Sequence, residues 1–256
     1  MPADCSIWSL EFCHADMPHD FFGGSGIFSN AGIIRIPMLY TLVVGGEVGG
    51  RQHVALVDCG FRDDYWLDRY AFPNAKLYVQ LDEFTGWSEA VSSTLQEPEA
   101  EQAWVFSSFD PTDLARAAQG IVDGRVVFVK GDEELLPGIT ARLAKDSHTF
   151  GSQWFHVGTG NGPYVAAGDT VYWYSNVEKM WAPGYGQGNS FNLIEVYRTL
   201  QRELKRETDR IIPGHDPEIA ARHTSWLSET GNSVTEINLR ADDHSRKPHP
   251  APQLFR

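Results

Sequence analysis

Apolar residues in the first half of the chain follow the two-residue period of β-strands. The segment SIWSLEFC (6–13) alternates in this way and contains two aromatic residues. The segment LYTLVVGGEVGGRQHVALVDCG (39–60) is predicted to form two strands joined by a glycine-rich turn at 45–50. A helix is predicted to begin at Asp110, which precedes a proline and can act as the cap. The predicted helices of this half are 82–90 and 110–119, and its further strands are 75–80, 125–130 and 139–144.

The second half of the chain has a similar succession of predicted strands and helices. A helix at 191–207 carries Leu193, Tyr197, Leu200 and Leu204 at helical spacing. Two batches of strands, each closed by helices, predict an α/β fold in which helices cover the outer faces of two packed sheets. The strands predicted in this half are 154–157, 164–167, 171–174 and 210–213.

The length and charge restrict the domain organisation and the partners. A chain of 256 residues with 42% hydrophobic residues can bury the core of one large domain, which we place at 1–241, before a polar, proline-rich tail at 242–256. The net charge of −13 argues against nucleic acid and anionic membranes, which require clustered Lys and Arg, and fits a small-molecule substrate. No apolar run reaches the ~18 residues that span a bilayer.

The cysteines indicate a reducing compartment. There are three of them, Cys5, Cys13 and Cys59, and no two are spaced as C-x-x-C. An odd number in a long chain does not predict a disulfide framework. We therefore predict three free thiols and a cytoplasmic location.

Three short motifs each place a metal-binding side chain just after an apolar strand. His148 lies in LAKDSHTFGSQ, Asp169 in YVAAGDTVYWY and His215 in DRIIPGHDPE. Two imidazoles and one carboxylate at strand ends can converge on one cation, and such donors suit zinc, and also iron or manganese. A single histidine after a strand is more often a surface or core residue than a ligand. The prediction therefore rests on all three motifs, each with its glycine-bearing turn.

The motifs LVDCG, SHTFGSQ, AAGDTVYWY and IIPGHD, in this order, resemble those of the metallo-β-lactamase-fold hydrolases. Within that superfamily the chain is most similar to the N-acyl homoserine lactonase group, and the similarity extends to about Trp226. The resemblance implies an αββα sandwich with a metal centre at one edge of its two sheets. It also implies quorum quenching as a role and a possible homodimer.

The resemblance assigns roles to five residues. His148 would bind a first zinc ion, Asp169 would bridge two, and His215 would bind the second. Asp58 would be a structural carboxylate beneath the site. Tyr172 would hydrogen-bond the substrate carbonyl or the leaving oxygen, although it also alternates with its neighbours as a packing residue of a strand would.

The most diagnostic motif of the family, His-x-His-x-Asp-His, is absent from this sequence. It is expected after Asp58 and before AFPNAKLYV (71–79), where FRDDYWLDRY contains no histidine. In the family this interval holds a helix, a strand and the motif, so the resemblance implies that this sequence is roughly forty residues shorter near Tyr70–Ala71 than its relatives. Without the motif, His148, Asp169 and His215 make at most one three-ligand site.

Three explanations for this gap stay open. An internal segment of the natural chain is missing from this sequence, the natural protein has lost catalysis, or other residues replace the ligands. For the third, CHADMPHD (13–20) offers His14, Asp16 and His19, although we predict a loop of solvated polar residues there.

The resemblance implies a metal-dependent hydrolase that opens a lactone, or a related cyclic ester or amide, by attack of a metal-bound hydroxide. Tyr172 would donate a hydrogen bond to the developing oxyanion. The alternative is a degenerate, non-catalytic member of the same fold that binds a metal ion or a small molecule. A glycine-rich loop at 183–190 is expected beside the site. The candidates for an apolar substrate pocket are Phe28 and Trp181, together with Phe21, Phe22 and Tyr185.

Overall fold

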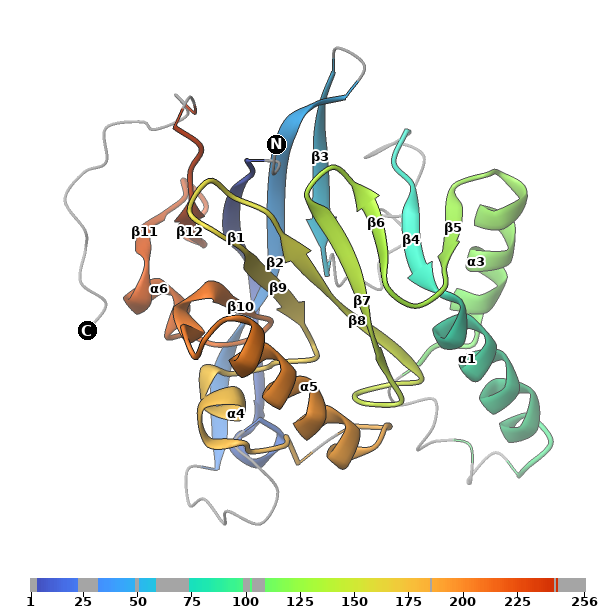
Figure 1. Cartoon of the computed structure of the whole chain (residues 1–256). Coiled ribbons are helices and arrows are strands. Elements are labelled where there is room, and N and C mark those ends of the chain that lie inside the picture. The colour runs from blue at the N-terminus through green and yellow to red at the C-terminus, as the bar shows by residue number, and fades with distance from the viewer. Residues whose placement is uncertain are drawn as a thin grey trace.

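The structure, a computed structural model, describes residues 4–22, 32–48, 51–58, 74–98, 102, 109–184, 186–241 and 243. The strands within these ranges form two five-stranded sheets and one parallel pair (Figure 1). The first sheet has the antiparallel order β11 (Thr224–Leu227), β12 (Ser233–Asn238), β1 (Ser6–Pro18), β2 (Ile33–Val48) and β3 (Arg51–Val57). The second has the order β10 (Ile211–Pro213), β9 (Tyr164–Gly168), β8 (Gly151–Val157), β7 (Ile139–Lys145) and β6 (Glu133–Leu136). The parallel pair is β4 (Leu77–Gln80) and β5 (Val126–Val129).

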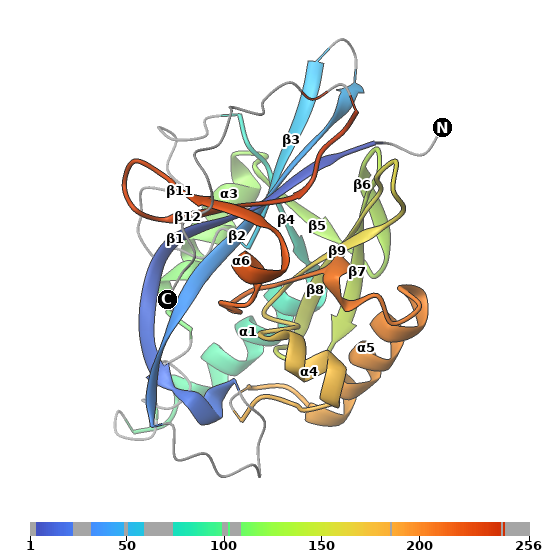
Figure 2. The same ribbon diagram turned by 90° about the vertical axis from the view of Figure 1, so that its left-hand side faces the viewer.

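Helices cover the strands from several sides. In the described part of the chain they are α1 (Leu81–Thr94), α3 (Thr112–Val122), α4 (Tyr174–Lys179), α5 (Ser190–Glu203) and α6 (Ile219–Arg222), with the 3₁₀ turns η1 (His19–Phe21) and η2 (Thr208–Arg210). Helices α1 and α3 contact β4 and β5, and α6 contacts β11 and β12. Helices α4 and α5 contact each other and cover the second sheet on the side away from the first, as Figure 2 shows.

The second sheet is apolar on both faces, which explains the hydrophobic runs of its strands. Val165 and Ala167 of β9 face α4 and α5, whereas Ala166 between them faces the first sheet. The same alternation puts Ile211 of β10 on the helix side and Ile212 on the sheet side. The predicted α/β fold of two packed sheets is therefore confirmed. The first sheet contributes Ile7, Leu39, Val43, Val57 and Ile237 to the shared core.

The predicted helix at 191–207 ends earlier than expected. Helix α5 stops at Glu203, and the backbone then turns through left-handed conformations at Lys205 (φ 52°) and Arg206 (φ 67°). The buried face is the predicted one, because Leu193, Tyr197 and Leu200 are at most 3% exposed.

The predicted strand at 171–174 is wrong. The chain turns there, and α4 begins at Tyr174. The Oδ1 atom of Asn176 accepts a hydrogen bond from the backbone N–H of Trp173 at 2.7 Å, while the N–H of Asn176 donates to the carbonyl of Trp173 at 3.0 Å. This local capping outweighs the β-propensity of the four residues 171–174, one of which is β-branched and three of which are aromatic.

The prediction of a loop at 13–20 is wrong for 13–18, although His14 and Asp16 are exposed to solvent as predicted. Strand β1 continues to Pro18 and pairs with β2 residue by residue. Alternation along the strand places Ala15 and Met17 on one face, and His14 and Asp16 on the other, exposed face.

The glycine-rich turn is shorter than predicted. Gly45 lies within β2, at a bulge opposite β3, where a Cβ atom would fall 1.9 Å from the ring of His53. A side chain at position 45 would therefore displace the ring of His53.

Several predictions concern residues outside the described ranges. They are the gap near Tyr70–Ala71, Cys59, Phe28, Tyr185 and most of the tail at 242–256. From the tail, Asp243 accepts a hydrogen bond from the hydroxyl of Ser6 at 2.5 Å. Cys5 and Cys13 are free thiols. No helix within the described residues has the length and hydropathy required to cross a membrane.

Candidate functional site

Three strand ends bring His148, Asp169 and His215 to one edge of the second sheet. Asp169 follows β9 directly, and His215 follows β10 by two residues. These strands are parallel, so their carboxyl ends coincide. Strand β7 is antiparallel to β8, which is antiparallel to β9, so the β7–β8 turn that carries His148 reaches the same edge. The sequence prediction that these side chains lie together is met by the fold.

The carboxylate of Asp169 lies between the two imidazole rings. Its Oδ1 atom is 2.8 Å from Nε2 of His215, and its Oδ2 atom is 3.5 Å from Nε2 of His148. His215 is 7% exposed and His148 is 9% exposed, whereas 43% of the Asp169 side chain is exposed. The two imidazoles are therefore enclosed by the protein, whereas the carboxylate can still be reached from outside.

The charges of Asp169 and His215 stabilise each other. Burial would lower the pKa of His215, but the hydrogen bond and charge of Asp169, aided by Asp58, raise it above its usual value. Burial would raise the pKa of Asp169, yet its bonds to the two histidines hold that pKa well below the usual range. His215 also faces the carbonyl of Pro37 through Nδ1 at 3.3 Å, which orients the ring. The site thus favours a positive group beside Asp169.

Asp58 directly follows β3 and lies next to this cluster. Its backbone is left-handed (φ 60°), and its carboxylate packs on Gly168, where a Cβ atom would be only 3.2 Å from Oδ2. Burial, and then the charge of Asp169, raise the pKa of Asp58 to about 7. The carboxyl group of Asp58 beside Asp169 makes the site still more favourable for a cation.

The donor atoms form two partial sites rather than one. A tetrahedral zinc ion with ligands at about 2.0–2.1 Å separates two donor atoms by about 3.3 Å. The distance from Nε2 of His148 to Oδ2 of Asp169, 3.5 Å, is close to this value, whereas the 2.8 Å from Nε2 of His215 to Oδ1 is that of a hydrogen bond. Each histidine, however, faces a different oxygen of Asp169. Accordingly, no group of three or more His, Cys, Asp and Glu side chains in the described ranges has the arrangement of a metal site.

This arrangement corrects the expectation of a single three-ligand site. Each partial site has two donors, whereas catalytic zinc takes three from the protein. The described residues therefore supply one donor fewer at each oxygen of Asp169 than catalytic zinc requires. The His-x-His-x-Asp-His motif, which the resemblance leads us to expect as a source of further donors, is absent from the sequence. The roles of His148, Asp169 and His215 as metal ligands stay predictions.

Tyr172 contacts both histidines. Its hydroxyl oxygen is 3.3 Å from Nε2 and 3.5 Å from Nδ1 of His148, and its ring centroid is 5.2 Å from that of His215. Its ring also packs edge-on against Phe22 with centroids 4.9 Å apart, which leaves the side chain 6% exposed. The tyrosine is thus fixed with its hydroxyl at the cluster, although its catalytic role is untested.

An apolar cavity of about 190 Å³ opens beside Asp169, Tyr172 and His215. Phe21 and Phe22, both candidates from the sequence, line it. Strands β1 and β2 supply the rest of the lining with Ala15, Met17, Ile36 and Met38. These four were not predicted, although the alternation of Ala15 and Met17 within CHADMPHD was a usable signal.

Trp181 does not belong to the lining of this cavity. It follows α4, its backbone N–H donates to the carbonyl of Asn176, and the ammonium of Lys179 lies 4.4 Å from its ring centroid. Its predicted contact with substrate stays a prediction, and Phe28 lies outside the described residues.

The turn that carries His148 is clamped on two sides. On one side, Glu83 of α1 accepts hydrogen bonds from the hydroxyl of Thr149 at 2.8 Å and the N–H of Gly151 at 2.5 Å. On the other, the backbone N–H groups of Gln187 and Gly188 donate to the carbonyl of His148 at 3.0 and 2.9 Å. The expected glycine-rich loop at 183–190 therefore does lie beside the site.

We expect Gly188→Ala to force this loop away from His148. The new Cβ atom would lie 2.1 Å from the carbonyl oxygen of Ser147, a backbone atom that cannot move independently. The substitution should destabilise the protein by about 1–3 kcal/mol, as overpacking does. Urea unfolding measures this loss. Gly46→Ala is the matched control, because nothing lies within 4 Å of its Cβ position. Equal urea midpoints for the two variants would contradict the close packing of the glycine-rich loop against the His148 turn.

Comparisons with known proteins identify the fold. No protein-family model and no curated protein matches the sequence. Among solved structures, a hydrolase of the beta lactamase superfamily, AbOPH, matches with a TM-score of 0.60 and 16% identity over 94% of this chain and 96% of its own. The dizinc quorum-quenching lactonase AidC matches with a TM-score of 0.55 and 13% identity over 92% and 95%. A probable metal-dependent hydrolase from Staphylococcus aureus matches with a TM-score of 0.56 and 14% identity over 83% and 90%.

These likenesses establish the fold. The chain has the αββα sandwich of the metallo-β-lactamase fold, as the sequence resemblance predicts. The cluster of His148, Asp169 and His215 occupies one edge of the second sheet of this sandwich.

Proposed function

We propose that the protein is a metal-dependent hydrolase that opens lactones or related cyclic esters. One observation carries this proposal: a single accessible carboxylate, Asp169, is shared by two buried imidazoles beside an apolar cavity. The names of the structural neighbours, which are hydrolases and lactonases, support the same reaction class. Zinc is the proposed metal, since AidC is a dizinc enzyme.

The residues of the chain have separate tasks in this proposal. His148, Asp169 and His215 would hold zinc, which when bound acts as a Lewis acid and lowers the pKa of water. Tyr172 lies where its hydroxyl can donate a hydrogen bond to an oxygen that becomes negative during ester cleavage. The cavity lined by Met17, Phe22 and their neighbours would take the apolar substituent of the substrate and exclude water from it.

A second candidate is a non-catalytic member of the fold that binds a metal ion or a small molecule. The observation in its favour is the absence of His-x-His-x-Asp-His from the sequence. Only half of the donors of a two-ion centre lie in the described cluster. Such a protein would keep the cavity and Asp169 without hydrolytic turnover.

Metal content and lactone ring opening separate the two candidates. For the hydrolase we expect bound zinc: about two ions per chain if the natural protein carries the missing donors, and one at most from the ligands in this sequence. Chelation should abolish ring opening, and added zinc should restore it. Metal analysis and titration of the released acid measure these outcomes. A metal-free, stably folded and inert protein would support the second candidate instead.

The mass of the natural protein shows whether it carries an additional segment near Tyr70–Ala71. The present sequence corresponds to 28.6 kDa. An additional segment that carries the missing donors would add roughly 4–5 kDa, since roughly forty residues cover a helix, a strand and the motif. Intact mass spectrometry detects such a difference directly. An unchanged mass, together with absence of bound zinc, would disfavour the hydrolase.

A further inference from the structure

Two loops that carry site residues are joined along their length. One is the turn from Val171 to Tyr174, which carries Tyr172, and the other runs from Gly214 to Asp216, which carries His215. Four hydrogen bonds connect them, and we call this set the turn ladder. Its bonds are Gly214 N–H to Val171 O (3.0 Å), His215 N–H to Tyr172 O (3.1 Å), Trp173 Nε1–H to His215 O (3.2 Å) and Tyr174 N–H to Asp216 Oδ2 (2.7 Å).

Asp216 is the carboxylate of this ladder, and both of its oxygens are used. Oδ2 accepts the bond from Tyr174 N–H, the shortest of the four, and Oδ1 accepts from the N–H of Glu218 at 2.8 Å. The residue is 4% exposed. Because hydrogen bonds to a charged acceptor are about twice as strong as neutral ones, Asp216 is the strongest single link between the start of α4 and the His215 loop.

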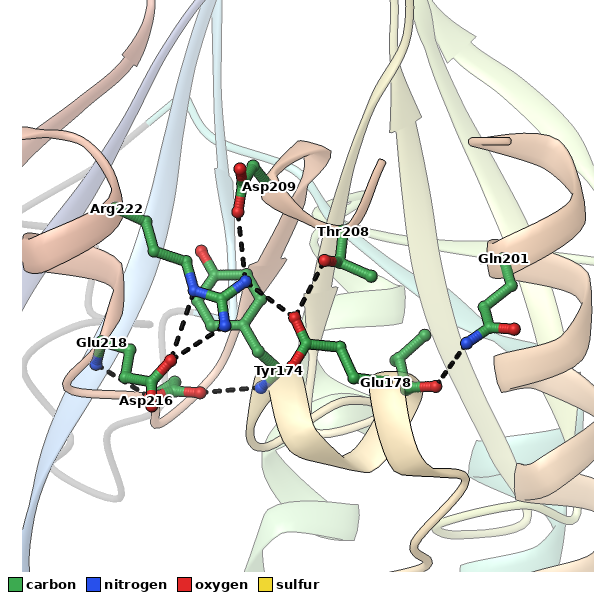
Figure 3. A network of polar contacts seen from close by, with 9 residues as sticks. Tyr174, Glu178, Gln201, Thr208, Asp209, Asp216, Glu218 and Arg222 are labelled. Atoms are coloured by element: carbon green, nitrogen blue, oxygen red, sulfur yellow. Dashed lines mark hydrogen bonds and ion pairs between the residues drawn. The ribbon is translucent and has the colours of Figure 1, made fainter. Parts of the chain in front are cut away.

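A second polar network, centred on Arg222, adjoins the bond between Asp216 and Tyr174 (Figure 3). The guanidinium of Arg222 contacts Glu178, Asp209 and Glu218, and it lies 3.8 Å from the ring centroid of Tyr174. The side chains of Asp209 and Glu218 are 69% and 63% exposed, so solvent screens these ion pairs. This network braces α4 and α6 from outside, whereas Asp216 acts at the turn that carries Tyr172.

We propose that Asp216 is a positioning residue that sets the separation of Tyr172 and His215. It fixes Tyr174 N–H, two residues after Tyr172, to the residue that follows His215. Rotation or drift of either loop would therefore stretch its hydrogen bond. This geometric claim holds with or without turnover, and only its consequence for catalysis rests on the proposed function.

Removal of the side chain in Asp216→Ala tests the claim in the metal-free protein. The ring centroids of Tyr172 and His215 are 5.2 Å apart, which allows a nuclear Overhauser effect (NOE) between their ring protons. We expect the variant to lose at least half of this NOE intensity. The milder Asp216→Asn, which keeps one accepting oxygen, should show an intermediate loss and serves if the alanine variant does not fold. Neither metal nor substrate is needed, so failure of the hydrolase proposal leaves this test intact.

Asp209→Ala is the matched control, because it removes an aspartate from the outer network and leaves the turn ladder unchanged. It should retain the wild-type NOE. Where zinc binds, Asp216→Ala should weaken the affinity by about tenfold or more, as loss of a residue that orients a ligand does. Wild-type NOE intensity in both Asp216 variants would overturn the proposal. An equal loss in Asp209→Ala would also overturn it, because the outer network would then set the separation.

Discussion

In the Asp169→Asn variant we expect zinc binding to be lost and hydrolysis to fall by at least about a thousandfold, since water without a metal ion regains a pKa near 15.7. Asp169 contributes one oxygen to each histidine, so both partial sites depend on this carboxylate. An amide has one accepting oxygen and no charge, and its NH₂ group would face one of the imidazoles. Metal analysis and the rate of lactone opening measure the loss.

The metal-free protein offers a second readout of the same substitution. The hydrogen bond and charge of Asp169 raise the pKa of His215 against the opposing effect of burial. The charged imidazolium is therefore the form that Asp169 stabilises, and its removal must lower the pKa of His215. A pH titration of the histidine ring signals by NMR should show this downward shift.

Asp146→Asn is the control for Asp169→Asn. Asp146 is exposed in the same β7–β8 turn and has a left-handed backbone (φ 50°) that asparagine tolerates. It should keep the zinc content, the rate and the His215 titration of the wild type. Unchanged zinc content and rate in Asp169→Asn would refute the shared-carboxylate site.

The convergence of the three side chains could be predicted from the sequence because strand ends in one sheet share an edge. His148, Asp169 and His215 each follow an apolar run, and the parallel pairing of β9 and β10 makes two of those ends coincide. The two apolar faces of the second sheet were likewise visible as continuous hydrophobic segments, such as YVAA and RII.

What the sequence did not reveal depends on contacts between distant segments. The aromatic run at 171–174 has strong β-propensity, but Asn176 and Asp216 bind its backbone N–H groups and turn it into a helix start. Spacing alone also could not show that the two histidines face different oxygens of Asp169. Because CHADMPHD is rich in polar residues, the sequence did not indicate a strand there. The apolar face of that strand, formed by Ala15 and Met17, lines the cavity.

The last prediction concerns Tyr172→Phe, which should lower kcat by about a hundredfold with a smaller effect on KM, the usual result of removing one donor to a developing oxyanion. The hydroxyl is the only atom removed, and the ring keeps its packing against Phe22 and His215. The fold should therefore be retained, with a change in unfolding free energy of about 1 kcal/mol or less. Steady-state kinetics on a lactone measure the effect.

Zinc content distinguishes a catalytic hydroxyl from one that merely orients His148. The Tyr172 hydroxyl is 3.3 Å from Nε2 of His148, so its loss could act through the histidine. If Tyr172 donates to the reacting oxygen, the variant keeps its zinc and loses turnover, because the donor acts only as charge develops there. Tyr164→Phe, on β9 with its ring against Arg210, provides a matched control and should behave as wild type. A drop in zinc content parallel to kcat would assign Tyr172 to the support of His148, and an unchanged kcat would remove it from the mechanism.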